Sequence, residues 1–199
     1  MNGNMEKTID QLVSNSIFLG ISYITSSVFS FIFWLILGKL LLPQDYGIVS
    51  TTINLSLLLA TVGVMGFNIS LIKLIPEYIE KGRNDKVTSL LRFSFKFILV
   101  LSIFIGIVIT GFSEILAKLI KLPSSAIKFT GLLIVLMSGA TFFDSSLRGF
   151  QNMKIVAASQ FFGQLLKLLV SMVLIYLGFA YFGPFIGVAT LYIMMIIFG

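Results

Sequence analysis

Residues 39–80, KLLLPQDYGIVSTTINLSLLLATVGVMGFNISLIKLIPEYIE, decide the fold of this chain. A short polar turn at 42–47 contains Pro43, which lacks a backbone donor, and Gly47, which allows a chain reversal. An apolar stretch of about 21 residues follows at 48–68, long enough to cross ~30 Å of hydrocarbon as a helix. Since one apolar helix ends at this turn and another begins, the pattern predicts a polytopic membrane protein.

The composition excludes most enzyme and metal-site chemistry. Of the 199 residues, 57% are hydrophobic and 11% are charged, against about 25% charged residues in a soluble domain. The chain has no Cys and no His, so it lacks thiolate ligands, the usual general base and the commonest metal ligand. We therefore expect no enzyme, no catalytic residue, no metal site and no cofactor.

The alternation of apolar stretches and turns continues along the chain. It predicts an all-α, polytopic transmembrane helix bundle that forms a single transmembrane lobe over residues 1–199. The six predicted spans are 17–41, 48–68, 90–111, 128–143, 156–178 and 181–199. The first is too long for a signal peptide and has no cleavage site after it, so we expect it to be retained. The chain stops on MMIIFG without a polar flank, and we expect a truncated C-terminus.

Two amphipathic segments are predicted to form helices outside the spans. Residues 69–81 keep a helical pattern up to Gly82 and are expected to lie at or below the membrane surface. Residues 112–122 carry Lys118 and Lys121 among apolar residues, which is typical of a short surface helix, and Pro123 ends it.

The distribution of basic residues predicts the orientation of the spans. The nine basic residues on the N-terminal side are Lys7, Lys73, Lys81, Arg83, Lys86, Arg92, Lys96, Arg148 and Lys154, and the four on the other side are Lys39, Lys118, Lys121 and Lys128. Because cytoplasmic loops carry the excess of Lys and Arg, the N-terminus is predicted to be cytoplasmic in a multi-pass protein of the cell membrane. The net charge of +6 is thus explained by the membrane, and no nucleic acid partner is expected.

One span carries a polar stripe. Gln160, Gln164, Lys167 and Ser171 are spaced four, three and four residues apart and share a helix face. Lys167 lies about 17 Å along its span, near the bilayer centre, where a lysine costs ~2.5–3.5 kcal/mol. It is either a structural lysine bonded to carbonyls or to an Asn such as Asn54, or part of a polar cavity; we favour the cavity.

Smaller polar groups mark two other faces. Asn54 and Thr61 are seven residues apart, and a buried Asn needs partners, so this face is predicted to look into the bundle. Ser22, Ser26 and Ser30 are spaced by four and form either a small-residue packing stripe or a cavity wall; we favour packing.

Charged pairs near the span ends have two interpretations. Arg92 and Lys96 either extend towards lipid headgroups or form a cationic mouth to a cavity, and we favour the headgroup interpretation. Asp144 and Arg148 follow the fourth predicted span, four residues apart, and are predicted to form an ordinary pair at a helix end.

Four segments of the chain carry a family resemblance. NSIFLG begins at Asn15, LGKLLLPQDYG covers 37–47, VMGFNISLIKLIPEYIEKGRND covers 64–85, and RGFQNMKIVAASQ covers 148–160. In this order they resemble the polysaccharide and oligosaccharide flippase family of the multidrug/oligosaccharidyl-lipid/polysaccharide exporter superfamily. Six spans match only the N-terminal lobe of such a transporter.

The resemblance implies an alternating-access transporter that moves an anionic, lipid-linked sugar through a cavity between two lobes. The implied partners are membrane lipid, the lipid-linked sugar, and a second transporter lobe or homodimer partner. The hypothetical substrate cavity, with its cytoplasmic mouth, comprises Lys167, Gln164, Gln160, Asn54, Arg92 and Arg148.

Two other functions remain open. A multidrug or cation antiporter of the same superfamily typically uses a membrane-embedded carboxylate, whereas the only charge in the middle of a predicted span is the positive Lys167. A non-transporting membrane scaffold of a glycan-assembly complex is the second. No GxxxxGK[ST] loop is present, so direct use of ATP is not supported.

Overall fold

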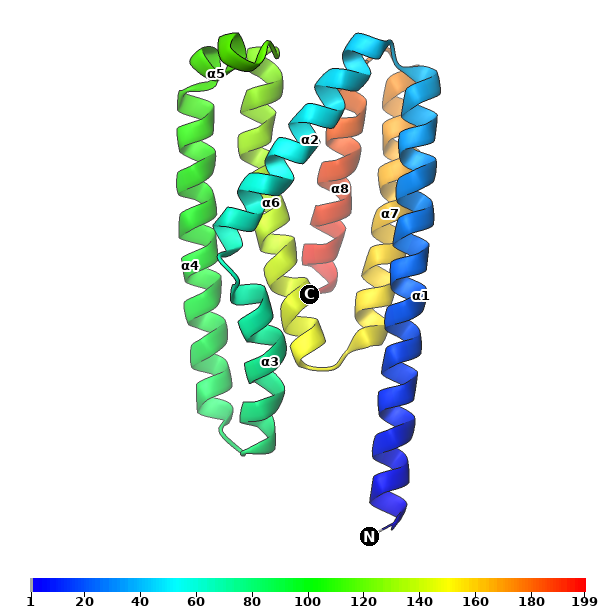
Figure 1. The fold of residues 1–199 in the computed structure, drawn as a ribbon, viewed down its shortest axis with the longest axis vertical. Helices are drawn as coiled ribbons and strands as arrows, with labels where there is room; N and C mark the ends of the chain where they lie inside the picture. The colour runs from blue at the N-terminus through cyan, green and yellow to red at the C-terminus, as the bar shows by residue number, and fades with distance from the viewer. Residues whose placement is uncertain (1) are drawn as a thin grey trace.

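The computed structural model describes the backbone of residues 2–199 and the side chains from residue 17 onward (Figure 1). The helices of this part are α1 (Asn2–Leu40), α2 (Pro43–Val64), α3 (Phe67–Glu80), α4 (Asn84–Gly111), α5 (Ser113–Ile120), α6 (Ser124–Gly149), α7 (Met153–Tyr176) and α8 (Phe182–Phe198). Five of them, α1, α2, α4, α6 and α7, are long and apolar enough to span a membrane, and α8 is a shorter apolar helix. The predicted all-α polytopic bundle is confirmed.

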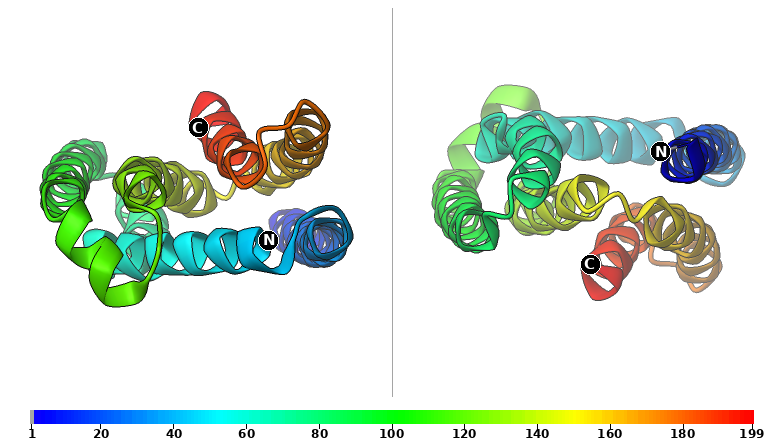
Figure 2. Two further views of the ribbon diagram at one scale, coloured as in Figure 1. Left: turned by 90° about the horizontal axis from the view of Figure 1, so that it is seen from above. Right: turned by 90° about the horizontal axis from the view of Figure 1, so that it is seen from below.

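Helix α6 is the centre of the bundle. In its most apolar window 56% of the residues are buried, against 11% in α1. It separates two hydrophobic clusters. One joins residues of α1, α2, α6, α7 and α8, including Phe33, Met137 and Phe185, and the other joins α3, α4 and α6 through residues such as Ile75 and Ile98. Seen along its length, the bundle places α1 and α7 at one edge and α4 at the other (Figure 2).

Glycine allows α6 and α4 to approach closely. A Cβ atom added to Gly106 would lie 2.9 Å from the carbonyl oxygen of Gly131, and one added to Gly131 would lie 2.8 Å from that of Gly106. Both obstacles are backbone atoms, which cannot rotate away. This contact therefore fixes the distance between the central helix and the α4 edge.

The second predicted span is interrupted. Helix α2 ends at Val64, Met65 and Gly66 both adopt left-handed conformations (φ 46° and 77°), and α3 starts at Phe67. Two such residues in succession cannot continue a right-handed helix. The apolar stretch 48–68 is thus one long helix joined to the start of a second one.

The fourth span is longer than predicted. Helix α6 begins at Ser124 and continues to Gly149, beyond both ends of 128–143. Asp144 and Arg148 therefore lie inside this helix rather than after it. Hydropathy falls at residue 144, but Ser145, Ser146 and Leu147 are all compatible with a helix, and the helix ends only near Gly149.

Both amphipathic segments form helices, α3 and α5, as predicted. Lys81, directly after α3, donates a hydrogen bond from its ammonium to Glu77 at 2.6 Å and holds the pKa of that carboxyl below its usual range. The chain N-terminus, the α3–α4 turn and the α6–α7 loop lie at one end of the bundle in Figure 1. The side chain of Lys7, counted on this side, lies outside the described side chains. The cytoplasmic assignment of this end stays a prediction.

The α4–α6 crossing leads to a stability prediction. Replacing Gly131 with alanine is expected to destabilise the protein by ~1–3 kcal/mol, because the added methyl group clashes with the backbone of α4. The apparent melting temperature in detergent measures the effect. Gly20→Ala is the control, since nothing lies within 4 Å of its new Cβ; it should leave stability unchanged or raise it by up to ~1 kcal/mol. Equal effects of the two substitutions would contradict the close crossing.

Candidate functional site

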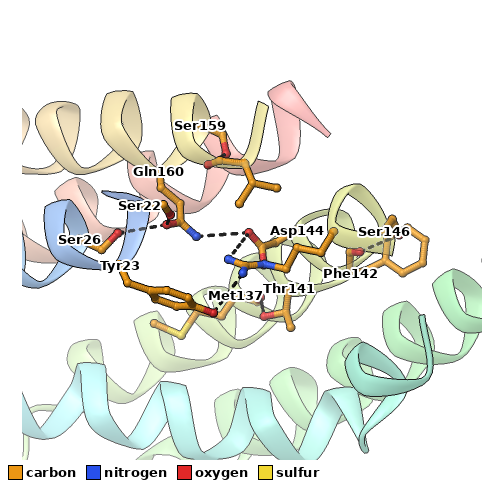
Figure 3. Close-up of polar contacts among 12 residues, drawn as sticks. Ser22, Tyr23, Ser26, Met137, Thr141, Phe142, Asp144, Ser146, Ser159 and Gln160 are labelled. Carbon is orange, nitrogen blue, oxygen red and sulfur yellow. Dashed lines mark hydrogen bonds and ion pairs between the residues drawn. The ribbon is translucent and has the colours of Figure 1, made fainter. Parts of the chain in front are cut away.

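A polar network joins α1, α6 and α7 near the end of the bundle where the α6–α7 loop lies (Figure 3). Gln160 on α7 occupies its middle. Its side-chain oxygen accepts hydrogen bonds from Ser22 and from Ser26 (3.1 Å), both on α1. Its amide nitrogen donates to Asp144 Oδ1 on α6 at 3.3 Å. One glutamine thus connects three helices, and its oxygen and its nitrogen both have partners.

Asp144 and Arg148 form the α6 part of this network. Arg148 Nε donates to Asp144 Oδ2 at 2.6 Å, and Nη2 contacts Oδ1 at 3.4 Å. The two side chains are only 17% and 11% exposed. Arg148 Nη1 also donates to the hydroxyl of Tyr23 on α1 at 3.1 Å, and its guanidinium lies 5.5 Å from the centre of the Tyr23 ring. Both carboxylate oxygens of Asp144 therefore have donors.

The network explains how the least buried span is held in place. Helix α1 packs mainly on α7 and has few contacts with α2, and most of its surface is exposed. Without water, an unpaired polar group inside a bilayer costs several kcal/mol. Because Ser22 bonds to Gln160 and Tyr23 bonds to Arg148 only while α1 stays docked, the network favours this position of the helix.

Lys167 lies two turns further along α7 and is 5% exposed. Its ammonium nitrogen lies 4.5 Å from the centre of the Phe33 ring on α1. Among the described side chains it forms no ion pair and no hydrogen bond. A cation–π contact is worth up to ~2 kcal/mol when desolvated, so Phe33 offsets part of the ~2.5–3.5 kcal/mol cost of the charge. No carboxylate of the described residues neutralises it.

Neighbouring groups of the stripe also lack partners. Gln164 Oε1 and Ser171 Oγ are buried and accept or donate no hydrogen bond among the described residues. Ser171 lies against Gly187 of α8, where an added Cβ would collide with its hydroxyl oxygen. The polar groups of the stripe therefore have hydrogen-bond partners at Gln160 and lack them around Lys167.

Two residues of the predicted cavity do not join this group. Asn54 is exposed, and its amide donates to the carbonyl of Ser50 in its own helix at 2.9 Å. Thr61 is likewise exposed and bonds to its own helix, so within this lobe neither residue is a buried polar group that needs a partner from another helix. Nor does Asn54 contact Lys167. Arg92 is exposed on α4, which packs on α6, α3, α2 and α5, at the edge opposite α1 and α7.

The sequence spacing alone does not reveal the partners of Gln160. The predicted span ends at residue 143, so Asp144 falls outside it. The spacing of Ser22 and Ser26 favours a role in helix packing rather than in hydrogen bonding. A signal was nevertheless present. Three serines on one face of α1, a glutamine on α7 and an Asp–Arg pair are too many polar groups for helices in lipid unless they bond to one another.

A cavity at the α2–α3 break is a second feature without a clear sequence signal. It has a volume of ≈ 260 Å³ and is lined by polar side chains among apolar ones, including Thr61, Asn68, Thr141 and Tyr192. The lining comes from α2, α3, α6 and α8, so it forms only when the helix break places Asn68 beside the central helix. Lys167 is not among the residues that line it.

Comparison with known protein families identifies the family of this chain. Residues 12–199 match the family model described as polysaccharide biosynthesis protein. The chain belongs to this family. Its members are transporters or flippases rather than enzymes, so the resemblance to polysaccharide flippases is confirmed and the chain is a flippase-type, multi-pass membrane protein. Searches among curated proteins and among solved structures found no match.

The Asp144–Arg148 pair leads to a prediction about stability. Replacing either residue with leucine is expected to cost ~2–3 kcal/mol of unfolding free energy, because the partner keeps an uncompensated charge in a mostly buried place. The double leucine variant should recover much of this loss. Denaturation of the wild type, both single variants and the double variant in detergent measures the coupling energy.

The exposed Glu77–Lys81 pair is a matched control. It has the same four-residue spacing, but its side chains are 41% and 53% exposed. Its coupling energy should stay below ~0.5 kcal/mol. Additive effects of the two α6 substitutions, as small as those of the control pair, would contradict a structural role for the network.

Proposed function

We propose that this chain forms one lobe of a flippase that moves an anionic, lipid-linked oligosaccharide or polysaccharide intermediate across the cell membrane by alternating access. The observation that carries the proposal is Lys167, a buried cation in the middle of a membrane helix that has no carboxylate partner among the side chains from residue 17 onward. Family membership supports a lipid-linked sugar as cargo.

The sign of the charge supports an anionic substrate. Buried charges in membrane helices are costly, and they mark substrate or ion pathways when they lack a structural partner. Phe33 offsets part of the cost of Lys167. A phosphate or pyrophosphate headgroup that reaches Lys167 supplies the missing counter-charge, and charge-assisted hydrogen bonds to phosphate are about twice as strong as neutral ones.

The environment of Asp144 argues against cation transport. This carboxylate lies inside α6 and is the group that a cation antiporter would need. However, Arg148 and Gln160 occupy both of its oxygens. A carboxylate with these donors is a poor ligand for sodium or for a cationic drug, because the arginine already neutralises it.

The site needs a second wall. The Lys167 stripe lies between α1 and α7, and α1 exposes many apolar side chains, including Ile24 (68%) and Phe31 (68%). We propose that a second transporter lobe, or a second copy of this chain, faces the lobe described here and closes the cavity. Alternating access then consists of rocking the two lobes against each other around the bound headgroup.

Charge removal at Lys167 tests the proposal. In the full-length transporter, Lys167→Met is expected to lower export of the lipid-linked glycan at least tenfold, because losing a charge-assisted contact to phosphate costs ~1.5–3 kcal/mol. Lys167→Arg should keep a substantial part of the activity. Export is measured by accumulation of the lipid-linked precursor in cells, together with the amount and melting temperature of the purified protein.

Lys39→Met is the control, since this lysine lies in the last turn of α1, outside the stripe, and its loss should leave export unchanged. Lys167→Met protein that folds well and exports at the wild-type rate would refute the proposal. If that variant also keeps its glycan-assembly partners, the scaffold function becomes the better explanation.

A further inference from the structure

The outer face of α4 carries a groove that the proposed transport site does not use. It has a volume of ≈ 310 Å³ and is lined by Phe93, Lys96, Phe97 and Val100. Arg92 lies one turn before Lys96, on the same side of the helix. The groove therefore combines one lining cation, Lys96, and a second, Arg92, next to it with an apolar surface that runs along the helix.

Aromatic rings give the groove a fixed wall. The rings of Phe93 and Phe97 stack with centroids 6.1 Å apart. Phe67, at the start of α3, contacts both of them, at 5.9 Å and 5.0 Å. The helix break at Met65 and Gly66 places Phe67 there, so the wall is built by two helices rather than by one exposed stripe.

The two cations of this face have no counter-charge among the described residues. Arg92 and Lys96 are exposed, and neither forms an ion pair or a hydrogen bond with a described side chain. The nearest carboxylate in α4 is Asp85, seven residues before Arg92 and thus ~10 Å along the helix axis. On the neighbouring α3, Glu77 is paired with Lys81.

The length of α4 places these cations at the level of lipid headgroups. Its 28 residues extend ~42 Å, against ~30 Å of hydrocarbon. Residues 97–111 contain no charged side chain, so the hydrocarbon covers roughly the last 20 residues. Arg92 then lies at the boundary, and Lys96 lies one turn inside it, within reach of the boundary through its long side chain.

We propose that this face of α4 binds an anionic phospholipid of the surrounding bilayer. Its headgroup lies between Arg92 and Lys96, and one acyl chain follows Phe93, Phe97 and Val100 towards the bilayer centre. Two unpaired cations favour a headgroup with net negative charge over a zwitterionic one, and clustered basic residues near a membrane surface gain about 1 kcal/mol each from anionic lipid. The site lies at the edge opposite Lys167 and does not depend on the proposed transport function.

Site-specific photolabelling tests this proposal. The full-length protein is placed in bilayers that contain phosphatidylglycerol or phosphatidylcholine, at equal mole fraction, with a diazirine on the acyl chain. Mass spectrometry of peptides then measures labelling of residues 93–100. Phosphatidylglycerol is expected to label this segment at least fivefold more than phosphatidylcholine. The ratio should fall in each of the single variants Arg92→Gln and Lys96→Gln and approach one in the double variant.

Two further variants separate the parts of the site. Lys118→Gln with Lys121→Gln removes the same charge from the opposite end of the lobe and should leave the ratio unchanged. Val100→Trp fills the groove but keeps both cations, and it should lower labelling by phosphatidylglycerol. Because Arg92, Lys96 and Val100 all lie at exposed positions outside the core, these variants are expected to keep the wild-type melting temperature.

Several outcomes would overturn the proposal. Equal labelling by the two lipids, or a preference for phosphatidylglycerol that survives Arg92→Gln/Lys96→Gln, removes the role of the cations. An unchanged result for Val100→Trp removes the role of the groove. Loss of labelling on addition of inorganic phosphate at constant ionic strength would assign the site to free phosphate instead of a lipid.

Discussion

The close packing of α6 against its neighbours is the constraint on which the rest of this structure depends. In a membrane, helices gain little by hiding apolar surface from lipid, so they associate through tight van der Waals contact at small residues. Gly131 of α6 meets Gly106 of α4, and Gly149 of α6 lies against Leu71 and Ile75 of α3. These contacts hold the α3–α4 edge on one side of the central helix. On the other side, α8 packs on α6 and α7, and α7 in turn packs on α1.

Hydropathy and length predict the spans because the bilayer imposes both. The predicted span limits are wrong where the helix does not coincide with the apolar stretch. Residues 48–68 are apolar throughout, yet the left-handed Met65 and Gly66 divide the segment; glycine signals such a break, whereas methionine does not. In α6 the hydropathy falls at Asp144 while the helix continues to Gly149. A polar residue ends an apolar pattern, but it ends a helix only when the backbone can no longer continue.

The sequence predicts which polar residues of the candidate site share a face of one helix, but not which residues of other helices they contact. The spacing of Gln160, Gln164 and Lys167 fixes their common face, because helix geometry alone determines it. Their hydrogen-bond partners depend on how α1, α6 and α7 pack against one another. The periodicity of one helix carries no information on this packing. Arg92 illustrates the limit: a cation near a span end has the same appearance in sequence whether its helix lines a cavity or, as in α4, forms the outer edge of the bundle.

The lobe buries charge in two ways that have opposite consequences. Arg148 is neutralised by Asp144 and donates a hydrogen bond to Tyr23, so its charge helps to dock α1 on α6 and is already compensated. Within the described part of the chain, the charge of Lys167 is compensated only by the face of the Phe33 ring, worth up to ~2 kcal/mol against a cost of ~2.5–3.5 kcal/mol. The remaining cost is small enough for the fold to tolerate a lysine without a counter-charge. A permanent carboxylate would remove that cost but would also remove the attraction for an anion. The transport function that we propose requires a site that binds and releases its cargo in turn, and a cation that is only partly compensated would meet this requirement.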